Sequence, residues 1–77
     1  MSVVPLETPA ERKAIKFVQA ELKRRIDAGL VKETAEILDV DDYGVETLSQ
    51  RSIHLDESYR IAAALGVSEE FAKQLAA

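Results

Sequence analysis

Apolar side chains recur at spacings of three and four residues early in the chain, and this period constrains the fold more than any other feature. Thr8 is suited to cap a helix, Pro9 fits the first helical position, and Glu11 completes a capping box. Gly29 offers a left-handed stop. The pattern predicts an amphipathic helix over residues 9–28. Its apolar stripe comprises Ala14, Ile15, Val18, Leu22 and Ile26.

Shorter helical patterns follow, and no stretch outside the N-terminal arm alternates with period two over a useful length. Residues that cap or end helices mark the boundaries: Asp41 or Asp42 before the third helix, Gly66 after the fourth and Ser68 before the fifth. Gly44 lies inside the third helix and weakens it by ~1 kcal/mol relative to alanine. We expect these helices over about residues 30–39, 42–51 and 55–65, with a fifth starting at residue 68.

The chain has 77 residues, which is enough for one domain with a small core. The sequence predicts an all-α, compact five-helix bundle over residues 9–77, preceded by an N-terminal arm at residues 1–8. The arm is apolar enough either to pair with another copy or to fold back over the core, and both possibilities stay open. Aliphatic residues should form the core, helped by four aromatic side chains, Phe17, Tyr43, Tyr59 and Phe71.

The charge is unevenly distributed along the chain. The net charge is −4, which by itself opposes attraction to nucleic acid. Residues 12–32 carry seven basic side chains and two acidic ones, whereas residues 33–77 carry ten acidic and three basic ones. The sequence is therefore a charge dipole, and the fold decides whether the molecule is one in space.

Several classes of protein are disfavoured. There is no cysteine, and the single His54 cannot build a metal cluster. The acidic run 39–42 lacks the remaining ligands of a calcium loop. No nucleophile–base pair or phosphate-binding glycine loop is visible, so we expect neither an enzyme nor a cofactor. No signal peptide or membrane span is apparent, which predicts a cytoplasmic protein of bacterial or phage style.

Residues 34–48 have the spacing of a helix-turn-helix. Ala35 is small where two helices would cross, and Asp39, four residues on, tolerates a left-handed turn. Leu38, Val40, Val45 and Leu48 fall where apolar side chains would lock the pair. The most specific match is the run Ile61-Ala62-Ala63-Ala64-Leu65-Gly66-Val67-Ser68. Over roughly residues 30–75 the chain resembles a lambda-repressor/Cro-type (XRE-like) helix-turn-helix domain.

This resemblance implies a small transcriptional regulator that binds double-stranded DNA as a homodimer, with residues 42–51 in the major groove. The chain departs from the family at Asp39, which replaces the usual turn glycine, and at Thr34, where a larger apolar residue would pack better. The third departure is acidity at the presumed reading surface, where carboxylates would meet the phosphates with like charge. The reading positions implied are Asp41, Asp42, Tyr43, Glu46, Thr47, Gln50 and Arg51.

Acidity at this surface supports a second hypothesis. The scaffold would then be a protein-interaction module, such as an anti-activator, an antirepressor, an antitoxin-like partner or a mimic of nucleic-acid charge, that binds a basic protein. The basic run Lys23, Arg24 and Arg25 would contact phosphates or an acidic partner, or would simply offset the acidic half of the chain. We rank DNA binding first because the match to the helix-turn-helix scaffold is good and because Gln50 and Arg51 are suitably placed.

Overall fold

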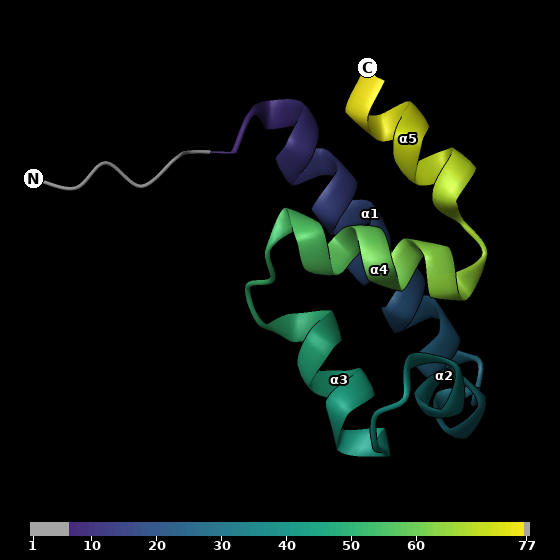
Figure 1. The fold of residues 1–77 in the computed structure, drawn as a ribbon. Helices are drawn as coiled ribbons and strands as arrows, with labels where there is room; N and C mark the ends of the chain where they lie inside the picture. The colour runs from purple at the N-terminus through teal and green to yellow at the C-terminus, as the bar shows by residue number, and fades with distance from the viewer. Residues whose placement is uncertain (1–6, 77) are drawn as a thin grey trace, which may run out of the picture.

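The computed structural model describes residues 7–76, which form five α-helices (Figure 1). The arm residues Val3, Val4 and Leu6 lie outside the described residues. The all-α prediction is confirmed. For the four helices whose two ends were both predicted, each observed end lies within one residue of the predicted one. The helices are α1 (Pro9–Asp27), α2 (Val31–Leu38), α3 (Asp42–Gln50), α4 (Leu55–Leu65) and α5 (Ser68–Ala76).

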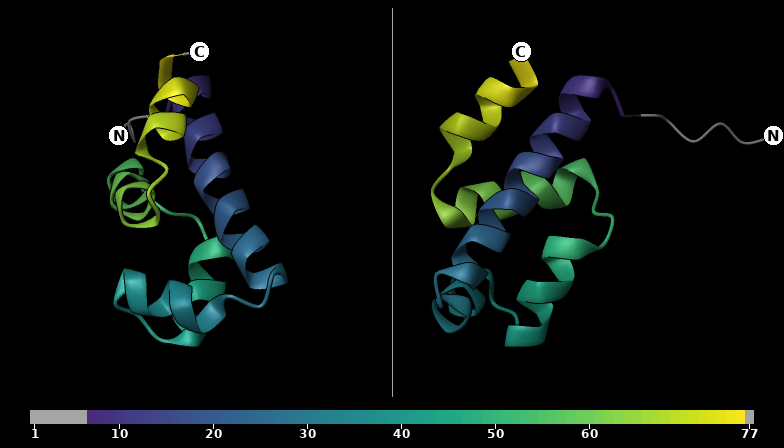
Figure 2. Two further views of the ribbon diagram at one scale, coloured as in Figure 1. Left: turned by 90° about the vertical axis from the view of Figure 1, so that its right-hand side faces the viewer. Right: turned by 180° about the vertical axis from the view of Figure 1, so that it is seen from behind.

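The longest helix, α1, organises the domain. It packs against all four other helices, with its most extensive contacts to α5 and α3. Seen from behind, α1 runs diagonally across the molecule, and α4 crosses it on the opposite side (Figure 2). Helices α2 and α3 form one end of the domain, whereas α5 and the start of α1 form the other. The short segment between α2 and α3 therefore lies at an extremity of the fold.

Local signals in the sequence set the helix ends as predicted. The Thr8 side chain accepts a hydrogen bond from the Glu11 backbone N–H, and the Glu11 side chain accepts one from the Thr8 N–H. Asp41 caps α3 by accepting from the Gly44 N–H at 2.7 Å. Asp39 has φ +59°, in the left-handed region that its short polar side chain tolerates. The turn between α2 and α3 therefore forms without glycine.

The prediction of four core aromatics is wrong for the two tyrosines. Phe71 is 1% exposed and Phe17 packs partly buried against the core, but Tyr43 and Tyr59 are 76% and 49% exposed. Tyr59 packs its ring edge-on against Phe71, with centroids 4.8 Å apart. Tyr43 lies in the first turn of α3, on a different side from buried Val45. The aromatic contribution to the core therefore comes mainly from Phe71.

Two other residues behave differently from expectation. Ile53, in the connector between α3 and α4, is buried in the core although it belongs to no helical stripe. Packing explains the glycine at position 44 inside α3, because a Cβ there would lie 3.0 Å from the Val40 Cβ. The glycine lets the first turn of α3 approach the turn that precedes it.

Candidate functional site

Helices α2 and α3 form a compact pair at one end of the molecule. Ala35 and Val45, the two residues predicted to pin this pair, are both buried. The Val40 backbone N–H donates to the Ala35 carbonyl oxygen at 3.0 Å, which closes the end of α2. The helices run in clearly different directions, since α2 is seen end-on where α3 is seen from the side (Figure 1).

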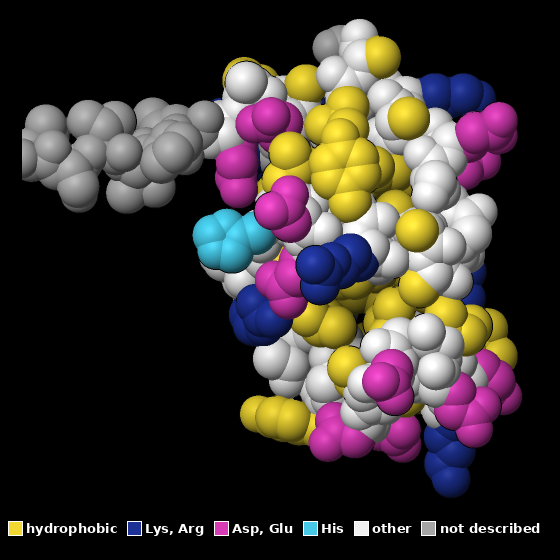
Figure 3. Space-filling model, in the orientation of Figure 1, with side chains coloured by type: hydrophobic (Ala, Val, Ile, Leu, Met, Phe, Trp, Pro, Cys, Tyr) yellow, Lys and Arg dark blue, Asp and Glu magenta, His cyan; other side chains and the backbone are white. Residues whose placement is uncertain are grey.

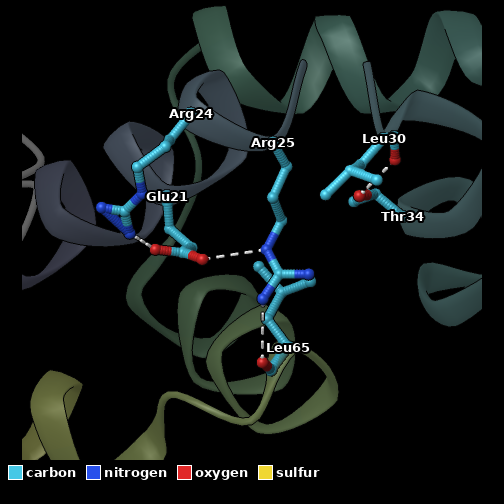
Figure 4. Close-up of polar contacts among 6 residues, drawn as sticks. All are labelled: Glu21, Arg24, Arg25, Leu30, Thr34 and Leu65. Carbon is cyan, nitrogen blue, oxygen red and sulfur yellow. Dashed lines mark hydrogen bonds and ion pairs between the residues drawn. The ribbon is translucent and has the colours of Figure 1, made fainter. Parts of the chain in front are cut away.

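Thr34 fits this packing better than the sequence suggests. We expected a loss of packing because a larger apolar residue is common there. Instead Thr34 is fully buried, and its hydroxyl donates to the Leu30 carbonyl oxygen at 2.7 Å (Figure 4). Within residues 7–76 no buried side-chain nitrogen or oxygen lacks a hydrogen-bond partner. The hydroxyl is therefore buried with its hydrogen-bonding capacity used.

The seven residues implied as a reading surface lie on α3 and at its two ends. All are exposed except Thr47, which is half-buried and donates its hydroxyl to the Tyr43 carbonyl oxygen at 2.9 Å. The structure divides several of them between two hollows. Tyr43, Thr47 and Arg51 line one hollow, and Glu46 and Gln50 line another together with Lys23. On α3 itself, Tyr43, Glu46, Thr47 and Gln50 are spaced by three and four residues, so they lie on one side of the helix.

Arg51 is engaged within the chain. One terminal nitrogen of its guanidinium, Nη2, lies 2.8 Å from Glu57 Oε2, and the other, Nη1, donates to the Ser52 carbonyl oxygen at 2.9 Å. The ion pair is partly exposed and so contributes at most about 1 kcal/mol. It nevertheless neutralises the one basic side chain among the seven positions. The observation weakens the reason for ranking DNA binding first.

The three basic residues Lys23, Arg24 and Arg25 of α1 do not form one exposed surface. Arg25 turns inward, where its Nε lies 2.9 Å from Glu21 Oε2 and its Nη2 donates to the Leu65 carbonyl oxygen at 3.2 Å (Figure 4). Arg24 pairs with the other Glu21 oxygen. Only Lys23 of the three borders α3. The sequence analysis missed the role of buried Glu21, although its spacing of three and four from the two arginines is the usual signal of helical ion pairs.

Sequence reasoning also missed an apolar groove. Val40, predicted to lock the helix pair, is 38% exposed, and Ile37 on the last turn of α2 is 48% exposed. Both border a hollow of about 350 Å³ where α2, α3 and α4 meet. A second hollow adjoins it, and the two share Val40, Leu48 and Glu57. We call these two hollows the α2–α3–α4 groove. Its apolar lining is Ile37, Leu38, Val40, Leu48, Ile61 and Ala64.

Carboxylates surround one side of this groove. Between Val31 and Gln50 the chain carries six acidic side chains and a single basic one, Lys32. Acidic side chains gather around the lower end of the face shown in Figure 3, next to the apolar side chains. The exposed acids on the turn and the start of α3 are Asp39, Asp41, Asp42 and Glu46. The end of the molecule formed by α2 and α3 is therefore both apolar and negatively charged.

Across residues 7–76, no group of three or more histidine, cysteine, aspartate or glutamate side chains is arranged to hold a metal ion. None of the helices α1 to α5 combines the length and the apolar character that crossing a membrane requires.

No family model matches the chain, and comparisons with curated proteins and with solved structures found no match.

Proposed function

We propose that this domain is a protein-interaction module whose α2–α3 end binds a positively charged segment of a partner protein. One observation carries the proposal: Ile37, Val40 and Tyr43 are exposed at the α2–α3 end, and residues 31–50, which form that end, carry six acidic side chains and one basic one. Contiguous exposed apolar side chains with a polar rim are typical of protein-binding sites. Negative charge around them favours a cationic partner and speeds the encounter with it.

The same surface opposes DNA. A protein gains affinity for duplex DNA mainly by placing lysine and arginine at phosphates, which releases counterions. Along α3 the exposed side chains include Asp42 and Glu46, and Arg51 is already paired with Glu57. Each carboxylate brought to the phosphate backbone adds repulsion where a DNA-binding protein needs attraction.

DNA binding is the second candidate, and it has an observation of its own. Arg12, Lys16 and Lys23 are spaced by four and seven residues along one side of α1. Arg12 and Lys16 share a hollow with Ser52, and Lys23 shares one with Gln50. These cations therefore lie beside the C-terminal part of α3 and the connector that follows it, where they could contact phosphates while Gln50 contacted a base. The resemblance to the lambda-repressor/Cro type supports this reading, but a shared fold does not fix function.

We expect the wild-type domain not to bind random-sequence duplex DNA even at about 50 mM salt, where non-specific binding is strongest. The double substitution Asp42→Lys with Glu46→Lys should create salt-sensitive duplex binding and abolish recovery of a basic partner protein from cell extract. Asp41 is left unchanged because it caps α3. Fluorescence anisotropy with labelled duplex and affinity capture followed by mass spectrometry measure the two effects.

The matched control is Glu69→Lys with Glu70→Lys at the start of α5, which raises the net charge by the same four units away from α3. The control should retain the partner and should not gain the duplex affinity of the α3 variant. Duplex binding by the wild-type domain that weakens steeply as salt rises would instead establish the DNA-binding candidate.

A further inference from the structure

The α2–α3–α4 groove offers a partner side-chain contacts and no main-chain pairing. Residues 7–76 form helices joined by short connections, so this part of the chain presents no strand edge to which an extended peptide could add. A recognition mode that suits a groove between helices is insertion of the apolar face of an amphipathic helix.

The shape of the groove suits more than one anchoring side chain. Its two hollows adjoin through Val40 and Leu48. Ile61 is buried beneath it, whereas Ile37 and Val40 are exposed at its rim. Apolar side chains one turn apart on a helix lie about 5–6 Å from each other, which allows successive anchors to occupy neighbouring hollows. The groove therefore fits a helix with an apolar stripe.

The charges on the two sides of the groove differ, and this difference gives the partner an orientation. On the side of the turn, Val40 lies between Asp39 and Asp41, and Asp42 follows. On the side of α4, Glu57 is paired with Arg51 2.8 Å away, and Arg60 lines the rim. The turn thus contributes three carboxylates next to Val40, whereas Glu57, Arg51 and Arg60 on the side of α4 together carry a net charge of +1. A partner helix with lysine or arginine along only one edge matches this arrangement.

We propose that the groove binds an amphipathic helix of a partner protein, with its apolar stripe against Ile37, Val40 and Leu48 and its basic edge toward the turn at residues 39–42. This inference rests on the proposed function and specifies the partner segment. Binding would cover the exposed Ile37 and Val40 side chains and place the partner's cations beside the carboxylates of the turn.

Two synthetic helical peptides test this proposal with the complete chain. Both carry a leucine stripe; one has lysine along one edge of the stripe, and the other has glutamate at the same positions. By fluorescence anisotropy at low salt, the lysine peptide should bind about tenfold more tightly than the glutamate peptide. Ile37→Ser should weaken binding of the lysine peptide about tenfold, because it removes an exposed apolar contact at the rim of the groove.

Leu30→Ser is the matched control, since Leu30 is 40% exposed and does not line the groove. It should bind the lysine peptide as the wild type does, and circular dichroism checks that both variants are folded. Unchanged binding by folded Ile37→Ser, equal binding of both peptides, or no binding of either at about 1 mM would overturn the groove proposal. If Asp42→Lys with Glu46→Lys loses the basic partner while folded Ile37→Ser keeps the lysine peptide, the proposed function stands and the groove assignment fails.

Discussion

Phe71→Ala should remove about 3–5 kcal/mol from the free energy of unfolding, the largest effect that we expect from a single substitution. Phe71 is the largest fully buried side chain in the described part of the chain, and it joins α5 to the core. A domain of this size has only about 4–12 kcal/mol in total, so the variant should be close to unfolding at room temperature. Urea titration followed by circular dichroism measures the loss.

Tyr43→Ala is the control for this prediction because Tyr43 is the most exposed large hydrophobic side chain. It removes a comparable aromatic ring from the surface and should change stability by no more than about 0.5 kcal/mol. A loss below about 1.5 kcal/mol for Phe71→Ala would contradict the assignment of Phe71 as the central aromatic of the core.

Ala35→Leu should also destabilise the domain, with a loss of about 1–3 kcal/mol from the free energy of unfolding. Ala35 lies on α2 and is buried in the core, where a larger side chain would displace its neighbours. Ala20→Leu is the control, because Ala20 is exposed on α1 and leucine is nearly as favourable in a helix as alanine. Equal stabilities of the two variants by urea titration would show that α2 and α3 do not depend on a small residue at position 35.

Features of the fold that depend on neighbouring residues could be predicted from the sequence. The capping box of Thr8 and Glu11, the left-handed Asp39 and the glycine that ends α4 each act within a few residues. The stripe of α1 also identifies its buried side correctly, because its 19 residues contain several turns of a regular pattern.

Features that depend on which helices pack together could not be predicted in this way. The ring of Tyr59 remains half-exposed beside Phe71, a contact between α4 and α5 that no local spacing specifies. Arg25 donates to the carbonyl oxygen of Leu65, which is forty residues away in the sequence. Ile53 is a single apolar residue in a connector, so periodicity could not identify it as part of the core.

The candidate site was predicted only in part, because part of it depends on which helices pack together. Its acidity can be read directly from Asp41, Asp42 and Glu46. The α2–α3–α4 groove cannot be read from the sequence. It exists because α4 packs beside α2 and leaves Ile37 and Val40 uncovered. The inward turn of Arg25 and the pairing of Arg51 also required the fold, and together they weaken the case for a DNA-contacting surface.

Amide chemical-shift mapping tests the central claim most directly. Titration of the ¹⁵N-labelled chain with the lysine-edged leucine peptide should perturb amides of residues 36–48 and 57–64, which surround the groove, and should leave the exposed side of α1 unchanged. Perturbations confined to α1 around residues 12–24, or perturbation of the α3 amides by duplex DNA at low salt, would contradict the account.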